Sequence, residues 1–161
     1  MFTRPFIDSL DFARRGGDLS GEVPVAELPR MADALTDFIG IISYGLRGLV
    51  GNDGKPYLVL TLEGSCNLRC QRCLNTLPYQ INLVSRLRLV SEGEIDSTDI
   101  EDDEVDSIPN EKHLDVLGLI EEELLLSLPI APKHDEGECE VVVEGLNRSN
   151  NPFAVLASLK K

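Results

Sequence analysis

Cysteine and histidine are the residues of this chain whose chemistry and spacing could build a site. The 161 residues include four cysteines and two histidines. Cys70 and Cys73 form a C-x2-C knuckle, which supplies two thiolates from one tight turn. His134 and Cys139 would add a second ligand pair from a distant loop and complete a closed, tetrahedral structural zinc site. The alternative is that the knuckle thiols are ordinary turn residues, unrelated to His134 and Cys139.

A second metal chemistry is suggested by the segment from Cys66 to Cys73, which reads CNLRCQRC. Its C-x3-C-x2-C spacing resembles that of radical-SAM enzymes, in which three thiolates hold a four-iron cluster and leave one iron open. Those enzymes house the cluster in a large α/β barrel, just after its first strand. Here about 65 residues of hairpin-like chain precede the motif and fewer than 90 follow it. We therefore reject this interpretation.

Apart from the cysteines, the sequence shows no catalytic motif. It contains no P-loop, GxGxxG, GxSxG or HExxH pattern. Carboxylates gather in the run 92–106, which has nine acids and no base. A pair such as Asp102 and Asp103 could bind Mg²⁺ and serve a metal-dependent nuclease. A run this acidic is more typical of a solvated loop, so we predict neither an enzyme nor a small-molecule substrate.

The charge is strongly acidic and unevenly distributed. The formal net charge is −13, and residues 89–161 contain five basic and nineteen acidic side chains. Such a chain is a poor general binder of nucleic acid but suits a basic protein partner, unless the charge serves solubility alone. Four arginines are the candidates for local contact with RNA. They could equally be ordinary surface residues. These are Arg69, Arg72, Arg86 and Arg88.

The apolar patterning predicts an α+β fold in a single domain, residues 1–161. Alternation over Pro56–Glu63 and Pro78–Val90, with a turn at 52–55, predicts an antiparallel sheet of about 4–6 strands. Short helices are expected near the N-terminus, over 8–15 and 28–36. We expect a flexible acidic loop over 91–111 and a separate C-terminal tail over 145–161.

One longer helix is predicted in the second half of the chain, capped by Asp115 and ended by Pro129. Its apolar stripe is wide, so we expect it to be buried against the sheet. Three consecutive glutamates would then lie on its exposed side and could dock a partner. These are Glu121, Glu122 and Glu123.

The apolar tail residues have two interpretations. Phe153 and Leu156, with their apolar neighbours, either pack on the chain's own sheet or form a short helix that docks a partner. The chain has neither an apolar run of about 20 residues nor a secretory signal pattern. A cytoplasmic protein without a membrane partner is the expectation.

Three blocks of sequence resemble a known family. They are LEGSCNLRCQRCLNTLPYQI at 62–81, DVLGLIEEELLLSLPIAPKHDEGEC at 115–139 and NPFAVLASLKK at 151–161. Together they resemble the YceD family, the large ribosomal RNA subunit accumulation proteins of bacteria, with plastid relatives. The resemblance implies a role in accumulation or processing of large-subunit (23S) rRNA. It also implies a large-subunit ribosomal protein or a 23S rRNA precursor as partner.

The resemblance bears on the metal question as well. The family pattern includes the knuckle of Cys70 and Cys73 but not Cys66, and it offers no catalytic residues to carry over. Some relatives are richer in cysteine after the helix, where this chain has His134 and Cys139. The resemblance therefore favours zinc in the family. It leaves a non-enzymatic assembly factor, a nuclease and a purely structural zinc module as the functions to weigh.

Overall fold

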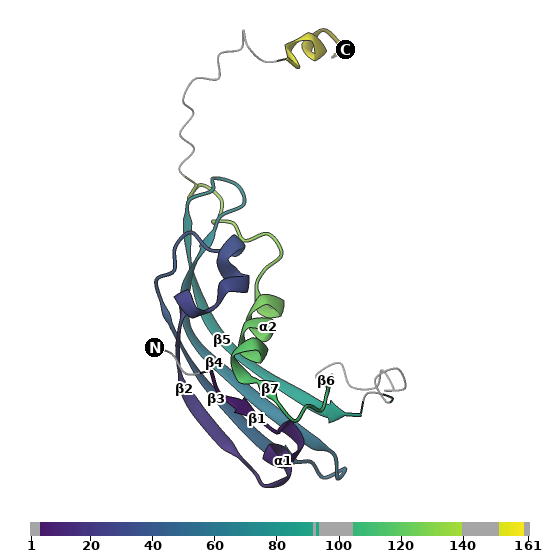
Figure 1. Cartoon of the computed structure of the whole chain (residues 1–161). Helices are drawn as coiled ribbons and strands as arrows, with labels where there is room; N and C mark the ends of the chain where they lie inside the picture. The colour runs from purple at the N-terminus through teal and green to yellow at the C-terminus, as the bar shows by residue number, and fades with distance from the viewer. Residues whose placement is uncertain (1–3, 92, 94–104, 140–151, 160–161) are drawn as a thin grey trace.

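The structure is a computed structural model that describes residues 4–91, 93, 105–139 and 152–159. Figure 1 shows a long, curved sheet with a helix across one face. The elements run in this order: β1 (Phe6–Ile7), α1 (Ser9–Arg14), β2 (Asp18–Pro24), η1 (Val25–Glu27), η2 (Pro29–Ala34), β3 (Ile41–Val50), β4 (Pro56–Arg69), β5 (Thr76–Val90), β6 (Asp106–Pro109), β7 (Leu114–Asp115), α2 (Val116–Ser127) and η5 (Ala154–Leu159). The α+β class is confirmed.

The main sheet has five strands in the order β2-β3-β4-β5-β6, and β1 pairs with β7 in a separate two-stranded sheet. The turn at 52–55 joins β3 to β4 in register, with Val50 opposite Pro56. Alternate residues of β4 then point to the same face. Leu58, Leu60 and Leu62 are fully buried, whereas Thr61 and Glu63 are exposed. This inner face carries the core.

Helix α2 covers the inner face, as its apolar stripe predicts. The Asp115 side chain accepts a hydrogen bond from the Leu117 N–H and caps the helix. The last helical turn is followed by Pro129, which cannot continue the ladder. Ile120 and Leu124 are almost completely buried in the core shared with the strands.

Two N-terminal elements pack on the rest of the fold: α1 lies against β3 and β4, and η2 lies against α2. Asp8 caps α1 through a bond from the Asp11 N–H, and α1 approaches β3 at Gly48, where a side chain would meet backbone of α1. The second predicted helix, 28–36, is instead the 3-10 segment η2, with Pro29 in its first turn. It packs beside α2 in Figure 1.

One strand was not expected from the sequence. β6 lies within the predicted acidic loop 91–111 and pairs with β5 in parallel, with Leu87 opposite Asp106. The other pairings in the sheet are antiparallel. Asp102, Asp103 and most of the acidic run lie outside the described residues, as do 145–151 of the tail. Over the described residues, no helix has the length and apolar character needed to cross a membrane.

Candidate metal centre

The knuckle forms the tip of the long hairpin made by β4 and β5. The Cys70 N–H donates to the Asn75 carbonyl, and the Leu74 N–H donates to the Cys70 carbonyl. The Arg72 N–H points at the Cys70 sulfur, 3.4 Å away, as in a turn built to present a thiolate. Leu74 completes the turn with φ 63°, a left-handed conformation that is uncommon outside glycine. The turn thus holds both sulfurs on one side.

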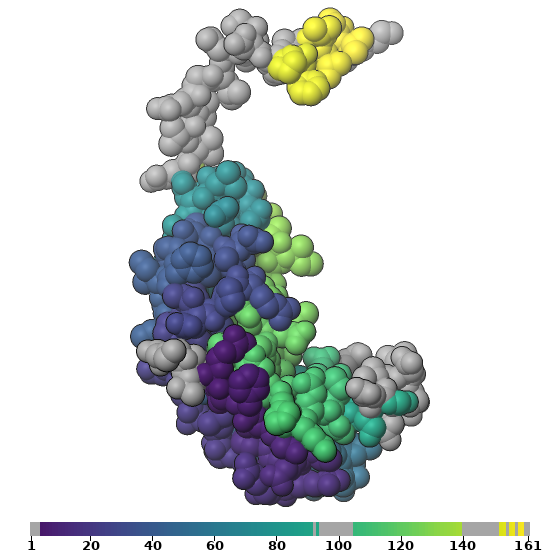
Figure 2. Space-filling model, viewed as in Figure 1, coloured from purple at the N-terminus to yellow at the C-terminus, as the bar shows by residue number. Residues whose placement is uncertain are grey.

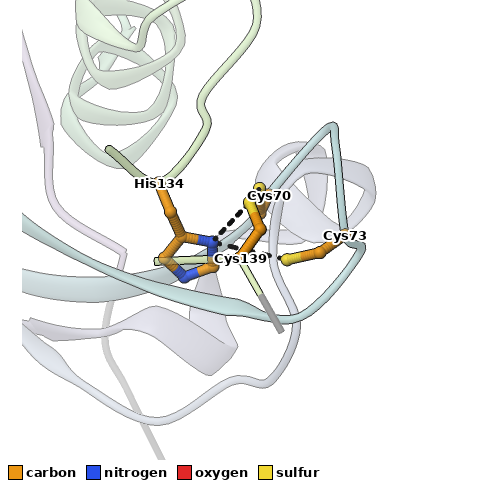
Figure 3. A group of neighbouring side chains, drawn as sticks. All are labelled: Cys70, Cys73, His134 and Cys139. Carbon is orange, nitrogen blue, oxygen red and sulfur yellow. Dashed lines mark hydrogen bonds between the residues drawn. The ribbon is translucent and has the colours of Figure 1, made fainter. Parts of the chain in front are cut away.

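The second ligand pair comes from the loop that follows α2. The Gln71 N–H donates to the Pro132 carbonyl at 2.8 Å, which ties this loop to the knuckle. The Arg72 guanidinium donates to the His134 carbonyl at 3.2 Å. Two segments about 60 residues apart in sequence therefore meet at one end of the sheet, with their side chains turned toward each other (Figure 3).

Three of the six separations among the four ligand atoms match the edges of a tetrahedron around a single ion. The Cys70 and Cys139 sulfurs are 3.8 Å apart, and His134 Nδ1 is 3.4 Å from Cys73 Sγ and 3.7 Å from Cys139 Sγ. Ideal zinc–ligand bonds would give edges of about 3.8 Å between sulfurs and about 3.6 Å between sulfur and nitrogen. All four atoms lie within 4.8 Å of one another. The geometry fits a four-coordinate ion.

The histidine is oriented for metal binding by its other ring nitrogen. His134 Nε2 is 3.0 Å from the Thr76 carbonyl, which accepts its proton. This bond, with the nearby Cys70 thiolate, raises the pKa of His134. It also leaves the Nδ1 lone pair of the neutral ring facing the sulfurs. A carbonyl that fixes the tautomer in this way is the usual partner of a zinc-bound histidine.

One of the thiols, that of Cys70, already favours the charged thiolate form. Burial raises the pKa of Cys70, but hydrogen bonds from the backbone at Cys73, His134 and Arg72 outweigh it and bring the pKa to about 5. Burial and the neighbouring sulfurs raise the pKa of Cys139 to about 11. A cation among the four would favour release of the remaining thiol protons, because metal binding requires thiolates.

The arrangement fits a structural rather than a catalytic ion. Three thiolates and one imidazole fill a tetrahedral shell and leave no position for water or substrate. The fourth cysteine, Cys66, takes no part: it lies on β4 opposite Tyr79, 2% exposed, in the core. The three-cysteine spacing of an iron–sulfur cluster is therefore not realised in space.

The four arginines do not form one surface. Arg69 and Arg72 lie exposed at the hairpin tip, where the Arg69 guanidinium donates to the Leu35 carbonyl. Arg86 is ten residues along β5 from Thr76, a separation of about 33 Å on an extended strand. Arg86 stacks over the Tyr57 ring, whereas Arg88 is partly buried and donates to Ser107.

The prediction that all three glutamates lie on the exposed side of α2 is wrong for two of them. Glu122 is exposed, but Glu121 and Glu123 are only 4% and 7% exposed. Glu121 accepts a hydrogen bond from the Arg30 N–H of η2, and Glu123 accepts one from the Ser85 hydroxyl of β5, each at 2.5 Å. Because α2 is covered by both η2 and β5, these two carboxylates are buried between elements of the fold, and their hydrogen bonds hold the helix in place.

Replacing Glu123 by glutamine is expected to stabilise the protein at neutral pH. Burial raises the pKa of Glu123 above the ordinary 4.5, partly offset by the Ser85 bond, with Asp106 and Glu122 adding to the rise. The folded state therefore binds this proton more tightly than the unfolded state. Stability falls as the pH rises from the pKa of the unfolded state through the higher pKa of the folded state. For Glu123→Gln we expect about 0.5–1 kcal/mol more unfolding free energy at pH 7.

Urea unfolding at pH 7 and again below pH 4.5 would measure this effect. The gain should vanish at the lower pH, where the parent carboxyl is protonated in both states. Glu122→Gln, on the exposed side of the same helix, is the matched control and should change little at either pH. An equal response of the two variants would contradict the prediction.

Fold and site together define a small α+β protein whose sheet ends in a closed group of three cysteines and one histidine. The chain belongs to the YceD family: the family described as large ribosomal RNA subunit accumulation protein YceD matches residues 58–160. It is 28% identical over 170 residues to the protein of that name from Haemophilus influenzae, covering 96% of this chain and 94% of the relative. No solved structure matches. The resemblance drawn from the three sequence blocks is confirmed.

Proposed function

We propose that this protein is a non-enzymatic factor that promotes accumulation of large-subunit rRNA by binding a basic protein of the large subunit. Membership of the family named for that accumulation carries the proposal. The acidic second half of the chain supports the choice of a basic partner, because opposite potentials speed encounter and fix register. A 23S rRNA precursor joined to that protein fits the same description.

The metal centre has a structural part in this proposal. Zinc held by Cys70, Cys73, His134 and Cys139 would bind the hairpin tip to the loop after α2. Among the described residues, three hydrogen bonds to carbonyls also join these segments, from the Gln71 N–H, the Arg72 guanidinium and His134 Nε2. A closed ion would therefore keep this end of the sheet in a single arrangement.

Capture with the tagged full-length chain, with and without nuclease, tests the choice of partner. A basic large-subunit protein should stay bound after nuclease and should be released as salt rises, because exposed charges are screened. Replacing the nine acids of the run 92–106 by their amides should abolish that capture. The control is Glu22→Gln with Glu63→Gln, two exposed acids on the outer sheet face. Loss of all binding after nuclease would contradict a direct protein partner.

RNA contact through β5 is the second candidate, and the exposed Arg86 guanidinium over the Tyr57 ring favours it. Arg86→Glu should lower recovery of large-subunit rRNA several-fold in the capture without nuclease, since each lost phosphate contact weakens binding. Asn82→Glu, on the same exposed face of β5, is the matched control. We leave Arg88 intact because its bond to Ser107 contributes to folding. Equal rRNA recovery with parent and Arg86→Glu would remove this face as a contact.

A further inference from the structure

A groove opens beside the metal centre, between the end of α2, η2 and the loop that follows α2. Its volume is about 410 Å³ and its lining is mostly apolar. Figure 2 shows the surfaces of η2 (blue), the hairpin tip (teal) and the loop (yellow-green) lying next to one another. Among the lining residues are Ala34, Leu68, Leu125, Leu128, Ile130 and Pro132.

The rim of the groove is unusually apolar for exposed surface. Leu126 is 74% exposed and Ile130 is fully exposed, although both are large aliphatic residues. Contiguous exposed apolar surface of this kind marks a site that another apolar surface covers. The mouth is also acidic. Exposed Glu122 lies one turn before Leu126 on α2, and the loop adds Asp135, Glu136 and Glu138 against the single base Lys133.

The C-terminal segment η5 has the complementary surface. Its 3-10 geometry places residues three apart in one row. Phe153, Leu156 and Leu159 form that row, and they are 69%, 55% and 74% exposed. The sequence continues directly into Lys160 and Lys161, opposite in sign to the acids at the mouth of the groove.

The segment can also reach the groove. Twelve residues, 140–151, join it to Cys139, whose sulfur lies beside those of the knuckle. A chain of that length spans up to about 40 Å. A tether this short gives an effective concentration of the order of millimolar, so even a weak apolar contact would be populated.

We propose that the groove between α2, η2 and the loop after α2 is the docking site of the chain's own C-terminal segment. The row of Phe153, Leu156 and Leu159 enters the groove, and the two lysines meet the acids at its mouth. The inference requires neither a bound ion nor a partner protein.

A single tryptophan placed at the groove tests the docking in the full-length chain, which has no tryptophan of its own. Ile130→Trp adds the reporter at an exposed position and leaves the core unchanged. Adding Leu156→Asp should shift its emission to longer wavelength and raise acrylamide quenching about twofold, as the docked population is lost. Ser158→Asp, an exposed residue outside the row, is the matched control and should leave both signals unchanged.

A second pair of variants exchanges the two positions: the tryptophan is placed on the C-terminal segment, and the disrupting substitution is placed on the groove. Phe153→Trp should be shielded in the otherwise native chain, and adding the rim substitution Leu126→Glu should expose it. The inference is overturned if Leu156→Asp and Ser158→Asp behave alike, or if neither reporter responds to the opposite surface. It is equally overturned if the shielding falls on dilution, since docking would then be between two copies of the chain.

Discussion

Cys73→Ser is expected to abolish zinc binding and to lower the unfolding free energy of the zinc-loaded protein by roughly 4 kcal/mol, the linkage for free zinc a thousandfold above its dissociation constant. Cys73 is partly exposed, and its sulfur faces His134 Nδ1 in the metal centre, so serine itself should cost little. Elemental analysis of protein purified without added zinc would give the stoichiometry, and urea unfolding would give the stability.

Cys66→Ala is the matched control for the metal prediction. Cys66 is buried in the core and outside the group of four, so this variant should lose some stability yet keep one zinc per chain. Chelation should destabilise the parent and Cys66→Ala but leave Cys73→Ser unchanged. Retention of a full equivalent of zinc by Cys73→Ser would rule out the proposed ligand set.

Leu124→Ala should destabilise the fold by about 2–5 kcal/mol, because it leaves a cavity where α2 packs on the sheet. Leu124 is fully buried and belongs to the core formed with the strands. Equilibrium urea unfolding would measure the loss. Leu126→Ala, two residues further on the same helix and 74% exposed, is the matched control. A similar loss in both variants would place the cost in helix propensity rather than in the packing of α2.

The local sequence was sufficient where a short-range rule decides the structure. The turn at 52–55 and the alternation of Leu58, Leu60 and Leu62 predicted the hairpin and its buried face correctly. Asp8 and Asp115 cap helices as their positions indicate, because a cap needs only residues two or three further on. These features depend on neighbours in the chain, which are visible in the sequence.

The sequence failed where the deciding contact is distant in the chain. The glutamates of α2 read as an exposed acidic face, yet Glu121 meets η2 and Glu123 meets β5. β6 lies in a segment that was predicted to be a loop, because its charged and polar residues lack the alternation typical of a strand. It is extended because it pairs with β5. No signal within either segment could have shown these partners.

The candidate metal centre lies between these two cases. Residue type and the C-x2-C spacing identified Cys70 and Cys73 from the sequence alone, since both ligands come from one turn. Joining them to His134 and Cys139 was one of two open interpretations, because a gap of about 60 residues fixes no distance. The sequence by itself thus determined the ligand chemistry, the hairpin and the capped helix. Only the packing of α2 on the sheet, which carries the following loop to the hairpin tip, decided that the four ligand atoms meet.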